Sequence, residues 1–167
     1  MVLLACSVAV QAQSQEPAQS PREFVEEFYN WYVPKALSQN PVDLALKLKS
    51  PRFSTQLAQL LKEDSAAQAK CAEIVGIDFD PFLSGQDPAD HYEVGDIAHE
   101  GQTYRADIYR LESGKRTDKP DVRAEFVQSQ GHWVFVNFLY PSDGSDLLKI
   151  LRLPRPKCTN PLPAKKK

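Results

Sequence analysis

Residues 121–140, DVRAEFVQSQGHWVFVNFLY, contain two runs of alternating apolar and polar side chains on either side of Gln130-Gly131. Alternation with a period of two is typical of strands with one buried face, and two residues with glycine at this point fit a tight hairpin turn. Such a turn predicts four facing pairs: Gln128 with Trp133, Phe126 with Phe135, Ala124 with Asn137, and Val122 with Leu139. One face of this hairpin is then apolar except for Gln128 and Asn137.

A second hairpin is predicted upstream, with Glu100-Gly101 as its turn. This turn pairs Asp96 with Arg105, and opposite charges across two strands favour a register. The pattern as a whole predicts four strands at His91–His99, Gln102–Glu112, Asp121–Ser129 and His132–Tyr140. Short polar turns between successive strands are typical of an antiparallel meander.

The chain before the strands has helical features. A capping residue followed by proline occurs at Ser20-Pro21, Asn40-Pro41 and Ser50-Pro51, which predicts three helix starts. The first helix carries one aromatic stripe, formed by Phe24, Phe28, Trp31 and Tyr32. Helices followed by a meander predict an α+β fold, in which N-terminal helices are cupped by a curved antiparallel sheet. A single domain is expected over residues 20–153.

The N-terminus reads as an export signal. Residues 1–12 have a short apolar run that ends in Val10-Gln11-Ala12, which predicts a signal peptide cleaved after Ala12 and a flexible leader over 13–19. In an alternative interpretation, Leu3-Leu4-Ala5-Cys6 is a lipobox and Cys6 is lipidated. The predicted location is the periplasm, or, with the lipid, an anchored position in the envelope. No basic residue precedes the apolar run, so a basic segment is expected upstream of Met1.

Cleavage after Ala12 leaves two cysteines, Cys71 and Cys158. An oxidising compartment favours a disulfide between them, although two free thiols stay an alternative because sequence gives no distance. Neither a Cys-x-x-Cys motif nor paired Cys/His spacing is present, so no metal is predicted.

Charge is unevenly distributed along the chain. Up to Leu148 there are 13 basic and 22 acidic residues, a net charge of −9, and the remainder carries seven basic residues and no acidic one. An acidic body argues against nucleic-acid binding, which needs a basic face. Residues 154–167 form a basic Pro/Lys tail, which is expected to be solvated or, alternatively, to contact an anionic membrane surface.

The segment from Asp78 to Asp87 is the strongest candidate for a binding site. It offers Asp78, Asp80, Gln86 and Asp87 within ten residues. Clustered carboxylates bind cations or shift one another's pKa, but Asp80-Pro81 and its neighbours equally suit a turn that closes on a buried Phe82. The remaining candidate ligand-binding residues are Tyr29, Tyr32, Trp133 and Asn137, each with the alternative of a structural place in the core.

Three blocks of sequence carry a family resemblance: FVEEFYNWY at 24–32, DFDPFLSGQD at 78–87 and GHWVFVNF at 131–138. Together they resemble the bacterial envelope family called domain of unknown function 3828, over roughly residues 21–151. The resemblance implies a fold of the nuclear transport factor 2-like superfamily, a sheet cupped around helices in a cone. It also implies an envelope location, and it implies no particular reaction.

No nucleotide-binding or hydrolase motif occurs in the sequence, and no cofactor is predicted. The first hypothesis is a non-catalytic binding or scaffold module that holds a small ligand, a peptide or an envelope protein. The second is a small lyase or isomerase with Asp78 or Asp80 as its base. The third is an immunity-type inhibitor, because an acidic body suits occlusion of a basic active site.

Overall fold

The computed structural model describes residues 19–163, so the predicted signal peptide, most of the leader and the alternative lipidation at Cys6 lie outside the described residues. Four α-helices and two short 3-10 helices are present in this range. They are α1 (Pro21–Tyr32), η1 (Val33–Lys35), α2 (Pro41–Leu48), η2 (Ser50–Arg52), α3 (Thr55–Gln68) and α4 (Leu147–Arg152). None of these helices is long and apolar enough to cross a bilayer.

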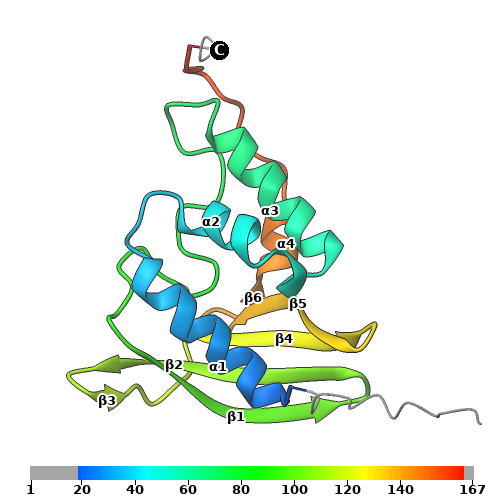
Figure 1. Cartoon of the computed structure of the whole chain (residues 1–167). Coiled ribbons are helices and arrows are strands. Elements are labelled where there is room, and N and C mark those ends of the chain that lie inside the picture. Colours follow the sequence, from blue (N-terminus) through cyan, green and yellow to red (C-terminus); the bar gives the residue numbers. More distant parts are fainter. Residues whose placement is uncertain (1–18, 164–167) are drawn as a thin grey trace, which may run out of the picture.

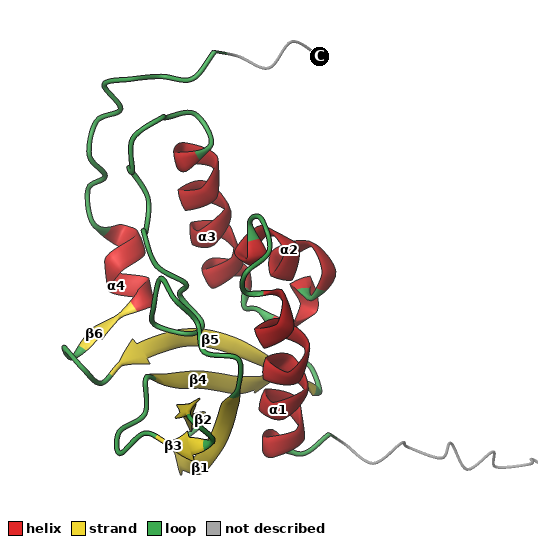
Figure 2. Ribbon diagram, turned by 90° about the vertical axis from the view of Figure 1, so that its left-hand side faces the viewer, coloured by secondary structure: helices red, strands yellow, loops and turns green. Residues whose placement is uncertain are grey.

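One antiparallel sheet follows the first three helices (Figure 1). Its strands are β1 (Tyr92–Glu100), β2 (Thr103–Glu112), β3 (Lys115–Arg116), β4 (Val122–Ser129), β5 (His132–Tyr140) and β6 (Ser145–Asp146). The order is β1-β2-β4-β5-β6, with β3 paired only to β2. The predicted α+β class and antiparallel meander are therefore confirmed. Helix α1 packs on β1 and β2, whereas α3 and α4 pack on β5 and on each other (Figures 1 and 2).

Helix α1 begins as the sequence predicts. Ser20 accepts a hydrogen bond from the backbone N–H of Glu23, whose side chain accepts one from the backbone N–H of Ser20, so the capping box is complete. Pro21 occupies the first helical position, where its missing N–H costs nothing. The buried face of α1 fills the sheet interior with aromatic rings, and Phe28 alone contacts six others.

The predicted helix start at Ser50-Pro51 is wrong. These residues form the 3-10 turn η2, and α3 begins four residues later, after the N-cap Ser54. Phe53 stays extended because it bridges to Phe135, and the N–H of Ser54 donates to the carbonyl of Phe135 over 2.8 Å. This segment therefore covers part of the open edge of β5, which would otherwise expose unpaired backbone groups.

In the β4–β5 hairpin the two pairs nearest the turn, Gln128 with Trp133 and Phe126 with Phe135, are confirmed. The two further pairs are wrong, because a β-bulge leaves Val136 without a partner and shifts the register by one. Ala124 consequently faces Phe138, and Arg123 faces Leu139. The bulge turns Phe138 into the core and Asn137 to the opposite face of the sheet.

The predicted register of the first hairpin is also wrong. Glu100 faces Thr103, so Gly101-Gln102 forms the turn and Arg105 faces Ala98 rather than Asp96. Gly101 has a φ of +62°, which a type II′ turn requires at its first central position and which glycine adopts without strain. Arg105 pairs instead with the carboxylates of Glu100 and Glu125 on the face away from α1.

The segment after α4 returns to the far end of α3 (Figure 1). A disulfide joins Cys71 to Cys158, with Cα atoms 5.7 Å apart and a sequence separation of 87, which confirms the predicted pairing. Backbone hydrogen bonds flank the disulfide, from Ala72 to Asn160 and from Leu162 to Lys70. Residues up to 163 of the basic tail are thus attached to the helical layer.

Candidate functional site

The interior of the cup, between the helices and the sheet, is filled. Six phenylalanine side chains in it are at most 1% exposed: Phe24, Phe28, Phe82, Phe126, Phe135 and Phe138. Their rings form a continuous cluster with centroid distances between 4.5 and 6.2 Å. A ligand site has to lie elsewhere on the domain.

An acidic cavity lies outside this core, between α2, α3 and residues 74–88. Its volume is about 530 Å³, within the range of small-molecule sites. Its walls are partly apolar, with Val42, Leu61, Ile77 and Phe79, and four aspartates also line it: Asp43, Asp64, Asp78 and Asp80. Among the described residues that line it, none is Lys, Arg or His.

A larger groove of about 820 Å³ runs between α3 and the β4–β5 hairpin. Its polar rim mixes charges of both signs, including Lys62 and Glu63, and it contains none of the residues that the sequence predicts for a site. We therefore take the acidic cavity as the candidate site.

Asp80 closes the inner side of the acidic cavity. Its Oδ2 accepts a hydrogen bond from the Tyr32 hydroxyl over 2.6 Å, and its Oδ1 accepts from the backbone N–H groups of Phe82 and Leu83. Burial of the carboxyl raises the pKa of Asp80, and the three hydrogen bonds oppose that rise in part. Asp80 is therefore the acceptor that orders the loop from Pro81 to Gly85.

Two further tyrosines fix the same loop from below. The hydroxyl of Tyr29 donates to the carbonyl of Phe82 over 2.9 Å, and that of Tyr140 donates to the carbonyl of Pro81 over 3.0 Å. Burial raises the pKa of both hydroxyls, so they stay protonated and act as donors. The predicted residues Tyr29 and Tyr32 thus support the loop from the core side.

Asp64 lies deeper and is only 7% exposed. Its Oδ2 accepts from the backbone N–H of Ile77 over 3.1 Å, and its Oδ1 pairs with the Arg155 guanidinium at 3.3 Å. The segment after α4 that the disulfide holds, residues 153–163 and called the strap below, therefore supplies a cation to the back of the cavity. Since the carboxylate is buried and paired, a change that displaces it should be costly.

A substitution at Gly76, which lies against the Asp64 carboxylate, can test how tightly this carboxylate is packed. A Cβ at position 76 would come within 2.6 Å of Asp64 Oδ2, so the Gly76→Ala variant should lose about 1–3 kcal/mol of unfolding free energy, measured by urea denaturation. Gly85→Ala, in the wall of the cavity, meets nothing closer than 3.9 Å and serves as the control. Equal stabilities of the two variants would contradict the close contact.

The other predicted site residues lie in different places. Asp78 and Gln86 face each other at the exposed rim of the cavity, with Gln86 Nε2 3.4 Å from Asp78 Oδ2. Asp87 is exposed and does not line the cavity. Trp133 donates to the carbonyl of Gln19 and packs on Tyr104 and Phe126 at the open end of the sheet.

Asn137 has a structural role, because its hydrogen bonds connect β5 to the start of α4. Its Oδ1 accepts from the backbone N–H of Leu148 over 3.1 Å, and its Nδ2 lies 3.4 Å from carboxylate oxygens of both Glu125 and Asp146. Asp146 is the N-cap of α4, so Asn137 fastens the start of that helix to β5.

Two carboxylates of the cavity, Asp43 and Asp64, are absent from the sequence predictions. Asp64 had a signal: it continues the buried stripe of Leu57 and Leu61 at helical spacing, where a carboxyl demands a partner. Asp43 had none, because acidic residues are ordinary in the first turn of a helix.

Comparisons of the chain with protein-family models, with curated proteins and with solved structures found no match.

Proposed function

We propose that this protein is an exported binding module whose acidic cavity takes a small organic cation with an apolar group. The single observation that carries the proposal is the composition of the cavity wall, with four aspartates, apolar side chains and, within residues 19–163, no basic lining residue. A concave site lined by charges of one sign concentrates ligands of the opposite sign, and its apolar part adds affinity for a hydrocarbon group.

The four carboxylates have unequal environments. Asp64 is paired with the guanidinium of Arg155, and Asp80 is held by three donors. Within the described part of the chain, Asp43 accepts only from the hydroxyl of Ser65, over 2.6 Å, and Asp78 only from the amide of Gln86. Asp43 and Asp78 therefore keep lone pairs for a ligand, and we assign them as the residues that bind the ammonium group.

The same geometry supports a binding role over a catalytic one. Asp80 combines burial with a raised pKa, as a general base does, but its carboxylate already accepts three hydrogen bonds that order the loop. On the core side of Asp80 the described residues fill the cup with buried aromatic side chains, so no substrate fits there. The immunity-type inhibitor stays a prediction that no particular contact favours.

We also propose a family, a fold type and a cellular location for the chain. We place the chain in the envelope family called domain of unknown function 3828, with a cone of the nuclear transport factor 2-like type and a periplasmic location, on the three blocks of sequence that resemble it. The helical layer against a curved meander is compatible with that fold.

Benzylammonium and benzoate test the site, because they share a ring and differ in charge. Isothermal titration at low salt should show binding of benzylammonium that weakens as salt rises, and no binding of benzoate. Asp43→Asn and Asp78→Asn should each weaken benzylammonium about tenfold, as expected for loss of one charge-assisted contact.

Asp87→Asn is the matched control, since Asp87 is an exposed carboxylate of the same segment outside the cavity lining. Its affinity should equal that of the wild type. Benzoate binding as tight as that of benzylammonium would overturn the proposal, and so would an Asp87→Asn variant weakened as much as Asp78→Asn.

A further inference from the structure

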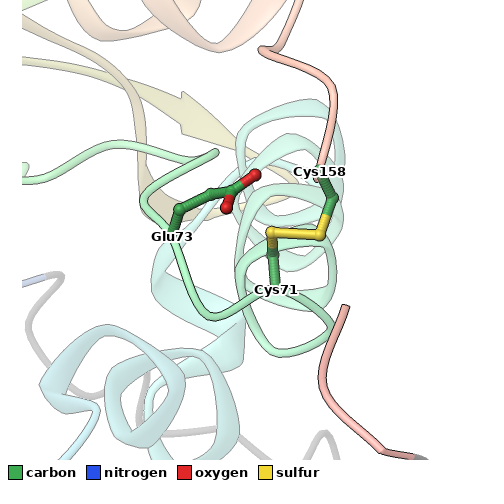
Figure 3. Close-up of side chains that lie close together, drawn as sticks. All are labelled: Cys71, Glu73 and Cys158. Carbon is green, nitrogen blue, oxygen red and sulfur yellow. A yellow bond between two sulfur atoms is a disulfide. The ribbon is translucent and has the colours of Figure 1, made fainter. Parts of the chain in front are cut away.

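We propose that Cys71, Cys158 and Glu73 bind a zinc ion when the disulfide between the two cysteines is reduced. The two sulfur atoms and a carboxylate oxygen of Glu73 all lie within 4.8 Å of one another. Figure 3 shows the Glu73 carboxylate beside the two sulfurs. Cys thiolates and a carboxylate oxygen are ordinary zinc ligands at about 2.0–2.3 Å, so ligands around one ion lie about 3–4 Å apart, which this cluster reaches by small side-chain rotations.

The backbone keeps the two cysteines facing each other without the S–S bond. The N–H of Ala72 donates to the carbonyl of Asn160 over 3.0 Å, and the N–H of Leu162 donates to the carbonyl of Lys70 over 2.9 Å. These bonds form a short antiparallel bridge between the segment after α3 and the strap. Reduction therefore leaves two thiols that are already adjacent, which lowers the entropic cost of binding an ion between them.

Glu73 is oriented toward the strap by its own partners. Its Oε1 accepts from the hydroxyl of Thr159 over 2.7 Å and from the backbone N–H of the same residue. These hydrogen bonds lower the pKa of Glu73, so its carboxylate is ionised at neutral pH. Partners of this kind fix a ligand's direction, as the outer shell of a zinc site does.

The surroundings leave room for a fourth ligand. Cys71 is 2% exposed, whereas Cys158 is exposed on the outer side of the strap. Water therefore reaches one side of the cluster and completes a tetrahedral coordination with three protein ligands. The site is separate from the acidic cavity, whose lining includes none of its three residues.

Zinc replaces the disulfide in two steps. An external dithiol reductant gives two electrons and two protons to the Cys71–Cys158 disulfide, becomes a disulfide itself and leaves two thiols. A zinc ion then forms two Zn–S bonds and displaces the two thiol protons. In the reverse direction an external disulfide accepts two electrons from the thiolates, takes up two protons to become a dithiol, reforms the Cys71–Cys158 bond and releases the ion. Zinc and the disulfide are thus alternative states of the same pair of cysteines.

The test uses the full chain with Cys6→Ser, which leaves only these two cysteines. The protein is reduced with a phosphine, desalted without oxygen and titrated with zinc against a chromophoric chelator. The reduced form should bind one equivalent and the oxidised form none, and cobalt should give thiolate-to-metal charge-transfer absorption. Glu73→Gln should weaken zinc at least tenfold, while Glu63→Gln, an exposed glutamate on α3, should leave the affinity unchanged.

A second readout needs no change at the proposed ligands. Zinc should protect both thiols of the reduced protein from alkylation, and a chelator should restore their reactivity. Equal zinc affinity in the oxidised and reduced forms would overturn the proposal. So would a Glu73→Gln variant that binds as tightly as the reduced parent protein, or thiols that zinc leaves fully reactive.

Discussion

The Asp80→Ala variant should lose about 3–5 kcal/mol of unfolding free energy relative to the wild type. Alanine removes the side-chain acceptor of the Tyr32 hydroxyl and of the N–H groups of Phe82 and Leu83. The N–H of Leu83 also donates to the backbone carbonyl of Asp80 and keeps that bond, so two donors lose their partner. Each buried donor left unpaired costs about 1–3 kcal/mol, and relief from burying the carboxylate offsets part of the sum. Urea denaturation at neutral pH measures the difference.

Asp80→Asn is the matched control. Its carbonyl oxygen still accepts from the two backbone amides, and its NH₂ donates to the Tyr32 hydroxyl oxygen, so the loop keeps its three contacts. We expect a loss well below that of Asp80→Ala. Comparable losses in the two variants would show that the loop depends on the charge of Asp80 and not on its role as acceptor.

The difference in unfolding free energy between the wild type and Asp80→Asn should change with pH in a definite direction. Burial raises the folded-state pKa of Asp80 above its value in the unfolded chain, so the folded protein holds that proton more tightly. Stability contributed by Asp80 is therefore present at low pH and lost as pH rises through the folded-state pKa. Asp80→Asn cannot titrate, so the wild type should gain stability relative to this variant on acidification. A constant difference from neutral to acid pH would contradict the raised pKa.

The sequence predicted the parts of the fold that depend on local pattern. The four long strands alternate along most of their length, and the capping box of α1 is complete within four residues, so neighbours in sequence suffice to recognise them. The bulge at Val136 was missed, because one added residue changes which side chains face inward without removing the apolar character of the strand. Phe135 and Phe138 are three residues apart and would lie on opposite faces of a regular strand, yet both are buried. This spacing was the sequence feature that indicated the bulge.

The candidate site was predictable only in part, since it is assembled from distant segments. Asp78, Asp80 and Gln86 share one loop and were found together, whereas Asp43 and Asp64 come from two helices. The pairing of Asp64 with Arg155 depends on a strap that enters the fold after the last strand, 91 residues further along the chain. Helix α4, which directly precedes that strap, has six residues, and its helical spacing of apolar side chains is too short to be recognised.

Loss of the disulfide should cost about 4–5 kcal/mol of unfolding free energy in the chain-entropy model. Cys71 and Cys158 close a loop whose ends are separated by 87 positions in sequence, and the bond restricts the unfolded chain across all of the described strands. The bond also helps to hold the strap that brings Arg155 to the buried Asp64, next to the backbone hydrogen bonds that remain on reduction, so loss of this ion pair is the competing explanation. Reduced and oxidised protein should be compared by urea denaturation, with a chelator present to keep zinc from the thiols.

The double variant Cys71→Ser with Cys158→Ser separates the crosslink from the reductant, and it should match the reduced wild type. Arg155→Gln in the oxidised protein isolates the ion pair, because the strap then stays attached while Asp64 loses its cationic partner. If the crosslink acts mainly through the unfolded chain, Arg155→Gln should lose clearly less stability than reduction does. Equal losses would mean that the disulfide stabilises the fold chiefly by keeping Arg155 beside Asp64, and the loop-closure explanation would then be wrong.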